Sequence, residues 1–258
     1  MSQFPRVQET PVPGPVPRFE IPDWRERHGV VAGITGRTDP AGSGFDLGLG
    51  TDAPVGEVMA RWRRFRQAEP GFGATILGYQ VHQTRVLWHP GGSGWVIVDG
   101  VDGHATRTPG LLLTVTVADC IPVYLLAPKI PAIALLHAGW RGTASGILAR
   151  GLEVLHEGCG AVPSDIVMHC GVGICGECYE VGSEVSSACG VPAEGPGPWH
   201  LDLREVLASQ ARALGVPRIS VSTWCSAHDR DRFFSHRASR GRDGRMVAYL
   251  GMTAPEGG

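Results

Sequence analysis

Hydrophobic and polar positions along the chain alternate between a spacing typical of strands and a spacing typical of helices. Continuous apolar runs predict buried strands at 111–117, 123–126 and 133–136, because a strand covered on both faces loses the polar–apolar alternation. Further strands are predicted at 30–38, 75–88, 95–99, 166–168, 219–223 and 246–250. Apolar residues at helical spacing predict helices at 54–69, 143–156 and 201–214. The pattern therefore indicates a mixed α/β fold.

No internal linker or repeat divides this pattern, so we expect a single catalytic domain over residues 21–252. The first residues are rich in proline (PVPGPVP at 11–17) and are predicted to form a disordered tail over 1–20. A flexible C-terminal tail is expected at 253–258. The chain has 37 glycines among its 258 residues, about twice the average usage, which indicates many tight turns between short strands.

Charge and cysteine content limit the partners and the cellular location that we expect for this protein. The net charge of −2 argues against nucleic acid or an anionic membrane as the main partner. The opening sequence MSQFPRVQET lacks the apolar segment of a signal peptide, and no apolar run reaches the roughly 18 residues that predict a membrane span. Seven cysteines without a secretory signal favour reduced thiols, so a cytoplasmic location is expected.

Chemically reactive side chains gather in the stretch 111–142, where predicted strands end. Asp119 and Cys120 follow the first apolar run, His137 ends the third, and Arg141 lies in the turn HAGWRG. Buried strands rarely end in such groups unless these bind or react with a ligand. We therefore expect the active site here, with Arg141 and the backbone N–H groups that precede the next helix forming an anion site.

Two residues outside this stretch are also candidates. In TILGYQVHQTRVLW, a strand places Ile76, Gly78, Gln80 and His82 on one face. A lone histidine in a strand is more often a hydrogen-bonded structural residue than a metal ligand, so both interpretations of His82 stay open at this point. Phe234, in DRFFSHR, is either a core residue or a platform for a stacked base.

A segment rich in cysteine lies further along the chain. Cys170, Cys175 and Cys178 have the spacing C-x4-C-x2-C of three ligands in a plant-type iron–sulfur loop. A cluster needs a fourth cysteine, and none of the remaining cysteines lies at the expected distance. A C-x2-C redox pair lacks a thioredoxin-like setting. A glycine-rich site loop with incidental thiols is therefore the favoured interpretation.

Five motifs together resemble one known family. They are QVH at 80–82, TVADCIPV at 116–123, HAGWRGT at 137–143, YEVG at 179–182 and RFFSHR at 232–237. Their combination is similar to the YfiH-type family, which was long labelled a laccase-like multicopper polyphenol oxidoreductase, or laccase domain protein. The family is now described as purine nucleoside phosphorylase. The similarity extends over nearly the entire chain, and it implies a four-layer α-β-β-α sandwich with mixed sheets.

The resemblance also implies a metal site. In this family a metal, generally taken as zinc, is held by two histidines and one cysteine, which by motif are His82, Cys120 and His137. Two imidazoles and a thiolate are a reasonable set of zinc ligands, and three protein ligands leave a fourth position for water or substrate. Copper is expected to bind in vitro as well, since it out-competes other divalent ions at most nitrogen and sulfur ligands.

The activity implied by the resemblance is phosphorolysis of purine nucleosides such as adenosine, inosine, guanosine or methylthioadenosine. Phosphate attacks the ribose C1′ and the purine leaves; family members are also credited with adenosine deamination. The expected catalytic residues are His82, Cys120, His137, Asp119 and Arg141. We expect Asp119 to orient a ligand histidine. Substrate contacts are expected from Arg141, Gly142, Tyr179 and Phe234.

Four positions depart from the family pattern. Gln83 stands where glycine is frequent, Asp46 where asparagine is frequent, and His236 where tyrosine is frequent. Val172 interrupts a common Gly-Pro pair. None of these is an expected metal ligand, so the departures concern substrate preference rather than metal binding.

Three other functions remain open from the sequence. In a metal-free cysteine hydrolase, His137 would activate Cys120; the implied fold resembles that of deamidating toxins with a Cys–His pair, and some relatives are linked to peptidoglycan editing. A copper-dependent polyphenol oxidase is disfavoured, because ten scattered histidines without a His-x-His pair do not suit several copper ions. A metal-binding protein without activity would leave Arg141 and the glycine-rich rim unexplained.

Overall fold

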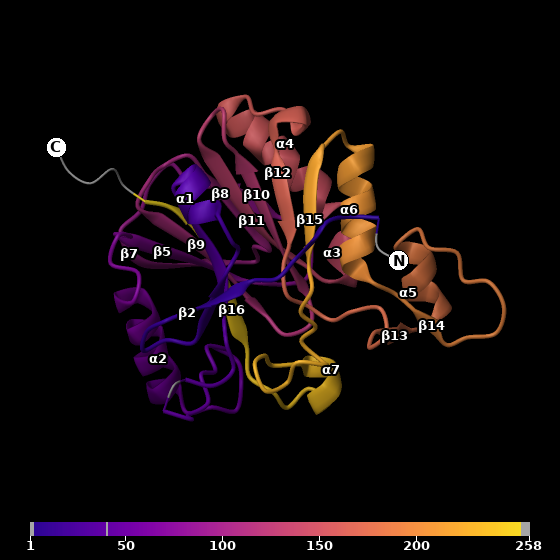
Figure 1. Ribbon diagram of the computed structural model, residues 1–258, viewed down its shortest axis with the longest axis horizontal. Helices are drawn as coiled ribbons and strands as arrows, with labels where there is room; N and C mark the ends of the chain where they lie inside the picture. Colours follow the sequence, from indigo (N-terminus) through magenta and orange to yellow (C-terminus); the bar gives the residue numbers. More distant parts are fainter. Residues whose placement is uncertain (1–2, 40, 254–258) are drawn as a thin grey trace.

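Two seven-stranded sheets form the centre of the protein in the computed structural model, which describes residues 3–39 and 41–253 (Figure 1). Sheet A consists, in spatial order, of β1 (Arg6–Val7), β15 (Arg218–Ser222), β12 (Val167–Cys170), β10 (Ile121–Ala127), β11 (Ala132–Ala138), β8 (Gly103–Thr106) and β6 (Val86–Trp88). Sheet B consists of β2 (Thr10–Val12), β3 (Arg18–Glu20), β4 (Val30–Thr35), β16 (Met246–Met252), β9 (Leu111–Val117), β5 (Ala74–Tyr79) and β7 (Gly94–Asp99). Both sheets mix parallel and antiparallel pairs. The strands β13 (Glu180–Val181) and β14 (Trp199–His200) form a separate antiparallel pair.

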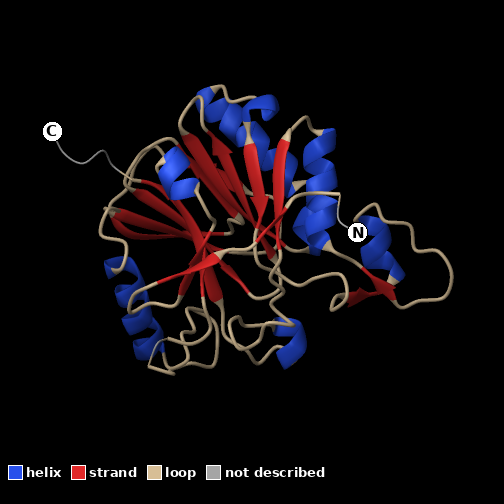
Figure 2. Cartoon of the chain, viewed as in Figure 1, coloured by secondary structure: helices blue, strands red, loops and turns tan. Residues whose placement is uncertain are grey.

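The helices are α1 (Trp24–His28), α2 (Val55–Gln67), α3 (Trp140–Ala144), α4 (Ile147–Cys159), the 3-10 turn η1 (Pro163–Asp165), α5 (Ser183–Ala188), α6 (Leu203–Ala213) and α7 (His236–Ser239). The three longest, α2, α4 and α6, lie on the outer faces of the two sheets (Figure 2). In the described part of the chain, no helix has the length and apolar character needed to cross a bilayer.

Three apolar clusters separate four layers. The first packs α4 and α6 against sheet A, the second lies between the sheets, and the third packs α2 against sheet B. Within the central cluster, the Tyr124 hydroxyl of β10 donates a 2.7 Å hydrogen bond across the sheets to the Gly33 carbonyl of β4. Gly33 must lack a side chain here, because an added Cβ would lie 2.4 Å from the Phe19 carbonyl oxygen. The expected α/β fold with mixed sheets is confirmed, and the order of its layers is helix, sheet, sheet, helix.

The chain crosses from sheet B to sheet A three times, each time at the carboxyl end of a strand of sheet B. These three crossings position the candidate site. The strands β5, β7 and β9 run parallel to one another, so their carboxyl ends lie at the same edge of sheet B. Each strand continues from that edge into a strand of sheet A: β5 into β6, β7 into β8, and β9 into β10. The three connections contain His82, Asp102 and Cys120, respectively. Parallel strands thereby bring together residues that are far apart in the sequence.

Most predicted strands and helices are present, with two informative differences. The predicted strand 111–117 matches β9, and the predicted strands 123–126 and 133–136 are the central parts of β10 and β11. The predicted strand 75–88 is instead two strands in different sheets, because the chain turns at His82, where φ is +59°. The predicted helix 143–156 is split into α3 and α4 by Gly146, which has a φ of +87°.

The prediction of a disordered tail over residues 1–20 is wrong for the part that the structure describes. β1 pairs with β15 at the edge of sheet A, and β2 pairs with β3 at the edge of sheet B. Between them, the buried Glu9 carboxylate accepts a hydrogen bond from Ser222 Oγ at 2.7 Å. Proline is tolerated in an edge strand, where no neighbouring strand needs its missing N–H, so the Pro-rich composition was misleading. Residues 1–2 and 254–258 of the two predicted tails lie outside the described residues.

Candidate active site

His82, Cys120 and His137 form one group at the edge where the chain crosses between the sheets. One donor atom from each residue lies within 4.8 Å of the others. The two imidazole rings are perpendicular, with centroids 4.7 Å apart. His137 is buried, Cys120 is half-buried and His82 is exposed, so the group opens to solvent on the His82 side.

The carboxylate of Asp102 fixes the orientation of this group. It accepts a 2.9 Å hydrogen bond from His137 Nδ1, which leaves Nε2 as the ring nitrogen that can bind a metal ion or Cys120. The same carboxylate accepts hydrogen bonds from the backbone N–H groups of Val81, His82 and Gln83, at 3.2, 2.9 and 2.9 Å. These three bonds hold the turn at His82 in its left-handed conformation, which is uncommon for a residue with a side chain.

Asp119 does not have the role that the sequence suggested. Its carboxylate accepts hydrogen bonds from Ser226 Oγ at 2.6 Å and from the Arg237 backbone N–H at 2.6 Å. Both oxygens are therefore engaged away from the histidines, and the residue itself forms a turn with φ of +84°. The predicted orientation of a ligand histidine by Asp119 is wrong, because Asp102 occupies that position.

Cys120 and His137 influence each other's ionisation. Burial disfavours the Cys120 thiolate, but the charge and hydrogen bond of His137, together with a hydrogen bond from His82, outweigh it and lower the pKa of Cys120 to about 6. Burial likewise disfavours the His137 imidazolium, but Cys120 and Asp102 outweigh it and raise the pKa of His137 to about 9. At neutral pH the thiol is therefore ready to act as a thiolate, the form that binds metals and attacks electrophiles.

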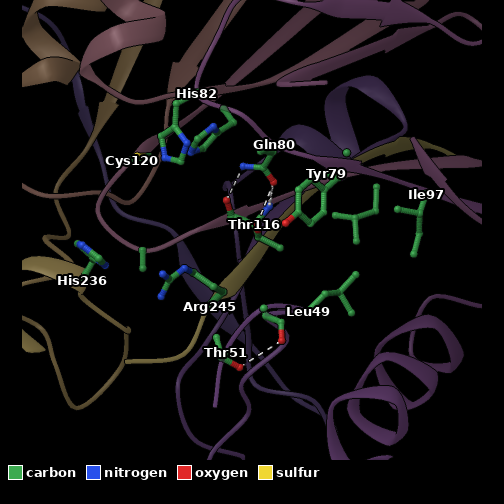
Figure 3. A pocket seen from close by; sticks show the side chains of 16 residues that line it. Leu49, Thr51, Tyr79, Gln80, His82, Ile97, Thr116, Cys120, His236 and Arg245 are labelled. Carbon is green, nitrogen blue, oxygen red and sulfur yellow. Dashed lines mark hydrogen bonds between the residues drawn. The ribbon is translucent and has the colours of Figure 1, made fainter. Parts of the chain in front are cut away.

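A cavity of about 410 Å³ opens on one side of the group (Figure 3). Its apolar wall contains Leu49, Tyr79 and Ile97, and its polar side contains Gln80 and Arg245. The Gln80 amide is fixed by Thr116, since Oε1 accepts a 2.7 Å hydrogen bond from the Thr116 N–H and Nε2 donates one of 2.9 Å to the Thr116 carbonyl.

Asp46, one of the departures from the family pattern, connects two segments that line this cavity. Its carboxylate accepts hydrogen bonds from the backbone N–H groups of Gly48 and Arg245, both at 2.8 Å, and from Thr51 Oγ1 at 2.7 Å. The loop around Gly48 and the start of β16 are thereby tied together.

A second cavity of about 230 Å³ opens on the other side of the group. It is lined by Trp140, Arg141, Tyr179 and Arg237. The two cavities share His82, Ala118, Cys120 and His236. The shared residues form the boundary between a larger space with an apolar wall and a smaller space with two guanidinium groups.

The structure separates the expected substrate residues into two sets. Arg141 and Tyr179 line the smaller cavity. The prediction for Phe234 is wrong: it packs in the core between the sheets and lines neither cavity of the described site. Gly142 lines neither cavity either; it allows close packing, since an added Cβ would lie 3.1 Å from the Gln83 carbonyl oxygen.

Sequence reasoning missed Asp102, Arg237 and the apolar wall of the larger cavity. Asp102 was not identified as a site residue, although it lies just after a strand that runs parallel to the strand before His82. The available signal was this order of strands, in which one polar residue follows each of three parallel strands. A single sequence does not reveal which strands are parallel, so the signal could not be used.

The donor set fits a metal ion. A thiolate and two imidazoles suit a divalent transition metal, and three protein donors leave a position for another ligand. Gly139 keeps this space open, because an added Cβ would lie 3.0 Å from Cys120 Sγ and 3.3 Å from the His82 ring. The hydrogen bond that His137 donates to the Asp102 carboxylate is of the kind that normally orients a metal-binding histidine.

Comparisons with known proteins agree with this description. A purine nucleoside phosphorylase from Deinococcus radiodurans is 35% identical over 254 residues, which cover 94% of this chain and 95% of that protein. Purine nucleoside phosphorylase YlmD from Geobacillus stearothermophilus is 40% identical over 166 residues, 60% of this chain and 61% of that protein. Adenosine deaminase RL5 from an unknown prokaryotic organism is 35% identical over 167 residues, 59% of this chain and 63% of that protein. The alignments with the last two relatives thus span less than two thirds of their length.

Structural similarity extends over the whole described fold. The crystal structure of YlmD from Geobacillus stearothermophilus superimposes with a TM-score of 0.82 at 30% identity, covering 96% of this chain and all of that chain. The family profile described as "Multi-copper polyphenol oxidoreductase laccase" matches residues 27–253. Since this match includes all strands of both sheets except β1, β2 and β3, and all of the candidate site, the chain belongs to that family, as its YfiH-type motifs predicted.

Proposed function

We propose that this protein is a purine nucleoside phosphorylase that converts a purine nucleoside and phosphate into the free base and ribose 1-phosphate. Relatives with this name match the chain over much or nearly all of its length. The observation that supports the function most directly is the position of the His82, Cys120 and His137 group between two adjoining cavities. A reaction between an anion and a nucleoside needs two such binding spaces with a common boundary.

The smaller cavity is the better place for phosphate. Arg141 and Arg237 line it, and a guanidinium group can bind two phosphate oxygens at once. Burial, with a smaller contribution from the charge of Cys120, raises the pKa of Tyr179 to about 12, so its phenol stays protonated and can donate a hydrogen bond. Arg237 lies over the Tyr179 ring at 4.9 Å and donates a 2.7 Å hydrogen bond to the Glu180 carbonyl, which fixes its position.

The larger cavity is the better place for the nucleoside. Tyr79 offers an aromatic face to a planar base, and Leu49 and Ile97 offer apolar surface. With the ribose at the boundary, a phosphate oxygen forms a bond to C1′ while the bond from C1′ to the purine nitrogen breaks, and the departing purine takes up a proton. The two cavities thereby orient nucleophile and leaving group on opposite sides of the sugar carbon.

Zinc is the metal that we propose for the site, with His82, Cys120 and His137 as its ligands. The mixed nitrogen and sulfur donors and the open fourth position are those of catalytic zinc sites. When bound, zinc would supply a Lewis acid and a water molecule of lowered pKa. Asp102 would hold His137 in the tautomer that presents Nε2.

Adenosine deamination is a second candidate activity. One relative bears the name adenosine deaminase, and water activated at the open position would be the nucleophile that hydrolytic deamination needs. This reaction requires no phosphate, which gives a direct way to tell the two activities apart.

Two alternatives from the sequence have weaker support. The pairing of Cys120 with His137, itself hydrogen-bonded to Asp102, would also suit a cysteine hydrolase, but an exposed third donor at His82 has no role in that chemistry. A polyphenol oxidase would need several copper ions close together. Among the described residues, the candidate site offers only the three donors of one ion.

The test is to incubate the metal-replete protein with adenosine, with and without phosphate, and to identify the products by mass spectrometry. Phosphorolysis predicts adenine and ribose 1-phosphate only when phosphate is present, whereas deamination predicts inosine in both conditions. Oxidation of a phenol with oxygen uptake, in the absence of nucleoside turnover, would overturn the proposal in favour of the copper enzyme. Turnover that survives complete metal removal would favour the cysteine hydrolase.

A further inference from the structure

A second group of metal-type donors lies outside the candidate active site. Cys175, Cys178, Cys225 and His228 each offer one donor atom, and these atoms all lie within 4.8 Å of one another. Cys175 and Cys178 belong to the turn before β13, and Cys225 and His228 belong to the turn after β15. Two segments that are about fifty positions apart in the sequence therefore converge through three thiols and one imidazole.

This grouping places two cysteines of the C-x4-C-x2-C pattern beside donors from another segment. Cys170, the first residue of the C-x4-C-x2-C pattern, is buried in the core of sheet A, and its Sγ contacts the Arg204 carbonyl. The place expected for a fourth ligand is taken by residues from another segment, Cys225 and His228. The thiols of Cys175 and Cys178 thus lie beside two further donor atoms rather than alone in the loop.

One separation within the group agrees with tetrahedral coordination. With zinc–sulfur and zinc–nitrogen bonds of about 2.3 and 2.0–2.1 Å, a tetrahedral ion places sulfur and nitrogen ligands about 3.6 Å apart. Cys175 Sγ and His228 Nδ1 lie 3.6 Å apart, a distance that suits two ligands of one ion as well as a hydrogen bond to sulfur.

Backbone hydrogen bonds hold both turns in place independently of a metal. The Cys175 N–H donates to Cys225 Sγ at 3.3 Å, and the Cys178 N–H donates to the Cys175 carbonyl at 3.1 Å. Asp229 supports the other turn, because its carboxylate accepts a 2.9 Å hydrogen bond from the Cys225 N–H. An isolated bridge between Gly173 and Cys225 joins the two segments. The donors are thus pre-positioned by the fold.

We propose that Cys175, Cys178, Cys225 and His228 bind a structural zinc ion, distinct from the metal of the candidate active site. Three thiolates and one imidazole are a common ligand set of structural zinc sites, and four protein ligands close the coordination sphere. The C-x2-C spacing of Cys175 and Cys178 is within the range typical of such sites. Zinc is favoured over an iron–sulfur cluster, which is normally held by four cysteines or, in Rieske centres, by two cysteines and two histidines.

The zinc ion would stabilise one wall of the smaller cavity. Tyr179, which lines that cavity, directly follows Cys178, and Ile174, which also lines it, directly precedes Cys175. Ser226 follows Cys225 and hydrogen-bonds the Asp119 carboxylate, next to Cys120. Loss of the ion should therefore loosen this wall while leaving the three donors of the active site in place. This inference does not depend on which reaction the active site performs.

The experiment counts zinc in a variant that lacks the active-site ligands. His82→Ala combined with Cys120→Ser removes two of the three active-site donors, and elemental analysis of this background variant is expected to give one zinc per chain. Adding His228→Ala or Cys225→Ser should lower the content to well under one. Adding His156→Ala, an exposed histidine on α4, or Cys159→Ser, a half-buried cysteine at its end, should leave it unchanged.

A second measurement on the same background identifies the ligands. Replacement of zinc by cobalt(II) should give the intense thiolate-to-cobalt charge-transfer band and the visible bands of a tetrahedral ion. The charge-transfer band should weaken in Cys178→Ser and stay unchanged in Cys159→Ser. His228 is exposed, so His228→Ala should fold even if a cysteine variant does not.

Four results would overturn the proposal. A zinc content near zero in the background variant would exclude the site. A zinc content that neither His228→Ala nor Cys225→Ser lowers would exclude it as well. Iron together with acid-labile sulfide would assign a cluster instead. When free thiols are blocked by alkylation during preparation, a disulfide among the three cysteines in protein without zinc would show that the group is a redox pair.

Discussion

The Asp102 carboxylate accepts a hydrogen bond from His137 Nδ1 at 2.9 Å while it caps the backbone turn that contains His82. One buried side chain thus sets the position of two proposed metal ligands, one in β11 and the other in the connection between β5 and β6. Removing the Asp102 carboxylate should affect both ligands together, because the His137 ring and the His82 main chain would each lose a hydrogen-bond partner.

We predict that Asp102→Asn lowers zinc affinity by about 10–100-fold, the usual effect of losing a partner that orients a metal-binding histidine. An amide keeps one acceptor oxygen but cannot accept from His137 and three N–H groups as a carboxylate does. The measurement is competition with a chromophoric chelator. Asp99→Asn, a nearby exposed aspartate at the end of β7, is the matched control and should bind zinc normally. Equal affinity in both variants would show that Asp102 only supports the fold.

The position of Asp102 also explains how far the sequence could predict this site. Cys120 and His137 were identifiable because polar groups at the ends of long apolar runs are conspicuous. Their partner was not, since the strand before Asp102 is partly exposed and its parallel alignment with β5 is a property of the sheet. The same reason applies to Cys225 and His228, which meet Cys175 only through the folding of two distant turns. Local patterns predicted the strands of the core, whereas contacts between distant segments required the structure.

Metal content should depend on the site that is altered. If both proposed sites bind zinc, the protein as purified contains two zinc ions per chain. His82→Ala, Cys120→Ala and His137→Ala should each reduce this to one, because each removes a donor from the same three-residue group. Elemental analysis provides the count. Full retention of zinc in Cys120→Ala would contradict the assignment of the active-site ligands.

Arg141 should govern the use of phosphate. We predict that Arg141→Ala raises the KM for phosphate about ten- to a hundredfold, because a hydrogen bond to a charged group contributes about 1.5–3 kcal/mol. Arg141→Lys should recover only part of the loss, since a two-pronged guanidinium becomes a point charge. Initial rates at varied phosphate and saturating nucleoside give the answer.

The control for this series is Arg107→Ala, which removes an exposed arginine outside both cavities. Its KM for phosphate should match that of the unaltered protein. If Arg141→Ala behaved like this control, Arg141 would have no part in phosphate binding and the site would have to lie elsewhere.

Tyr79 should govern the binding of the nucleoside instead. Tyr79 is 61% exposed as a residue and lies on the wall of the larger cavity, where a purine can stack on its ring. Stacking of a base on an aromatic side chain is worth about 1–3 kcal/mol, so Tyr79→Ala should raise the KM for adenosine by about five- to a hundredfold. Tyr79→Phe keeps the ring and should resemble the unaltered protein. An effect of Tyr79→Ala on phosphate rather than adenosine would reverse our assignment of the two cavities.

The ionisation of Cys120 gives a prediction that concerns pH. Because His137 and His82 lower its pKa to about 6, Cys120 in protein stripped of metal should react with iodoacetamide at a rate that falls as the pH drops below that value. His137→Ala removes the largest stabilising charge, so the pKa should rise and the rate at neutral pH should fall. Cys175 and Cys178 serve as internal comparisons, since burial raises the pKa of both thiols and they should react slowly. Peptide mapping by mass spectrometry follows each cysteine separately.

Zinc should protect Cys120 from alkylation by binding its sulfur. Rapid alkylation of Cys120 in the zinc-loaded protein would mean that the thiolate is free and would favour the cysteine hydrolase.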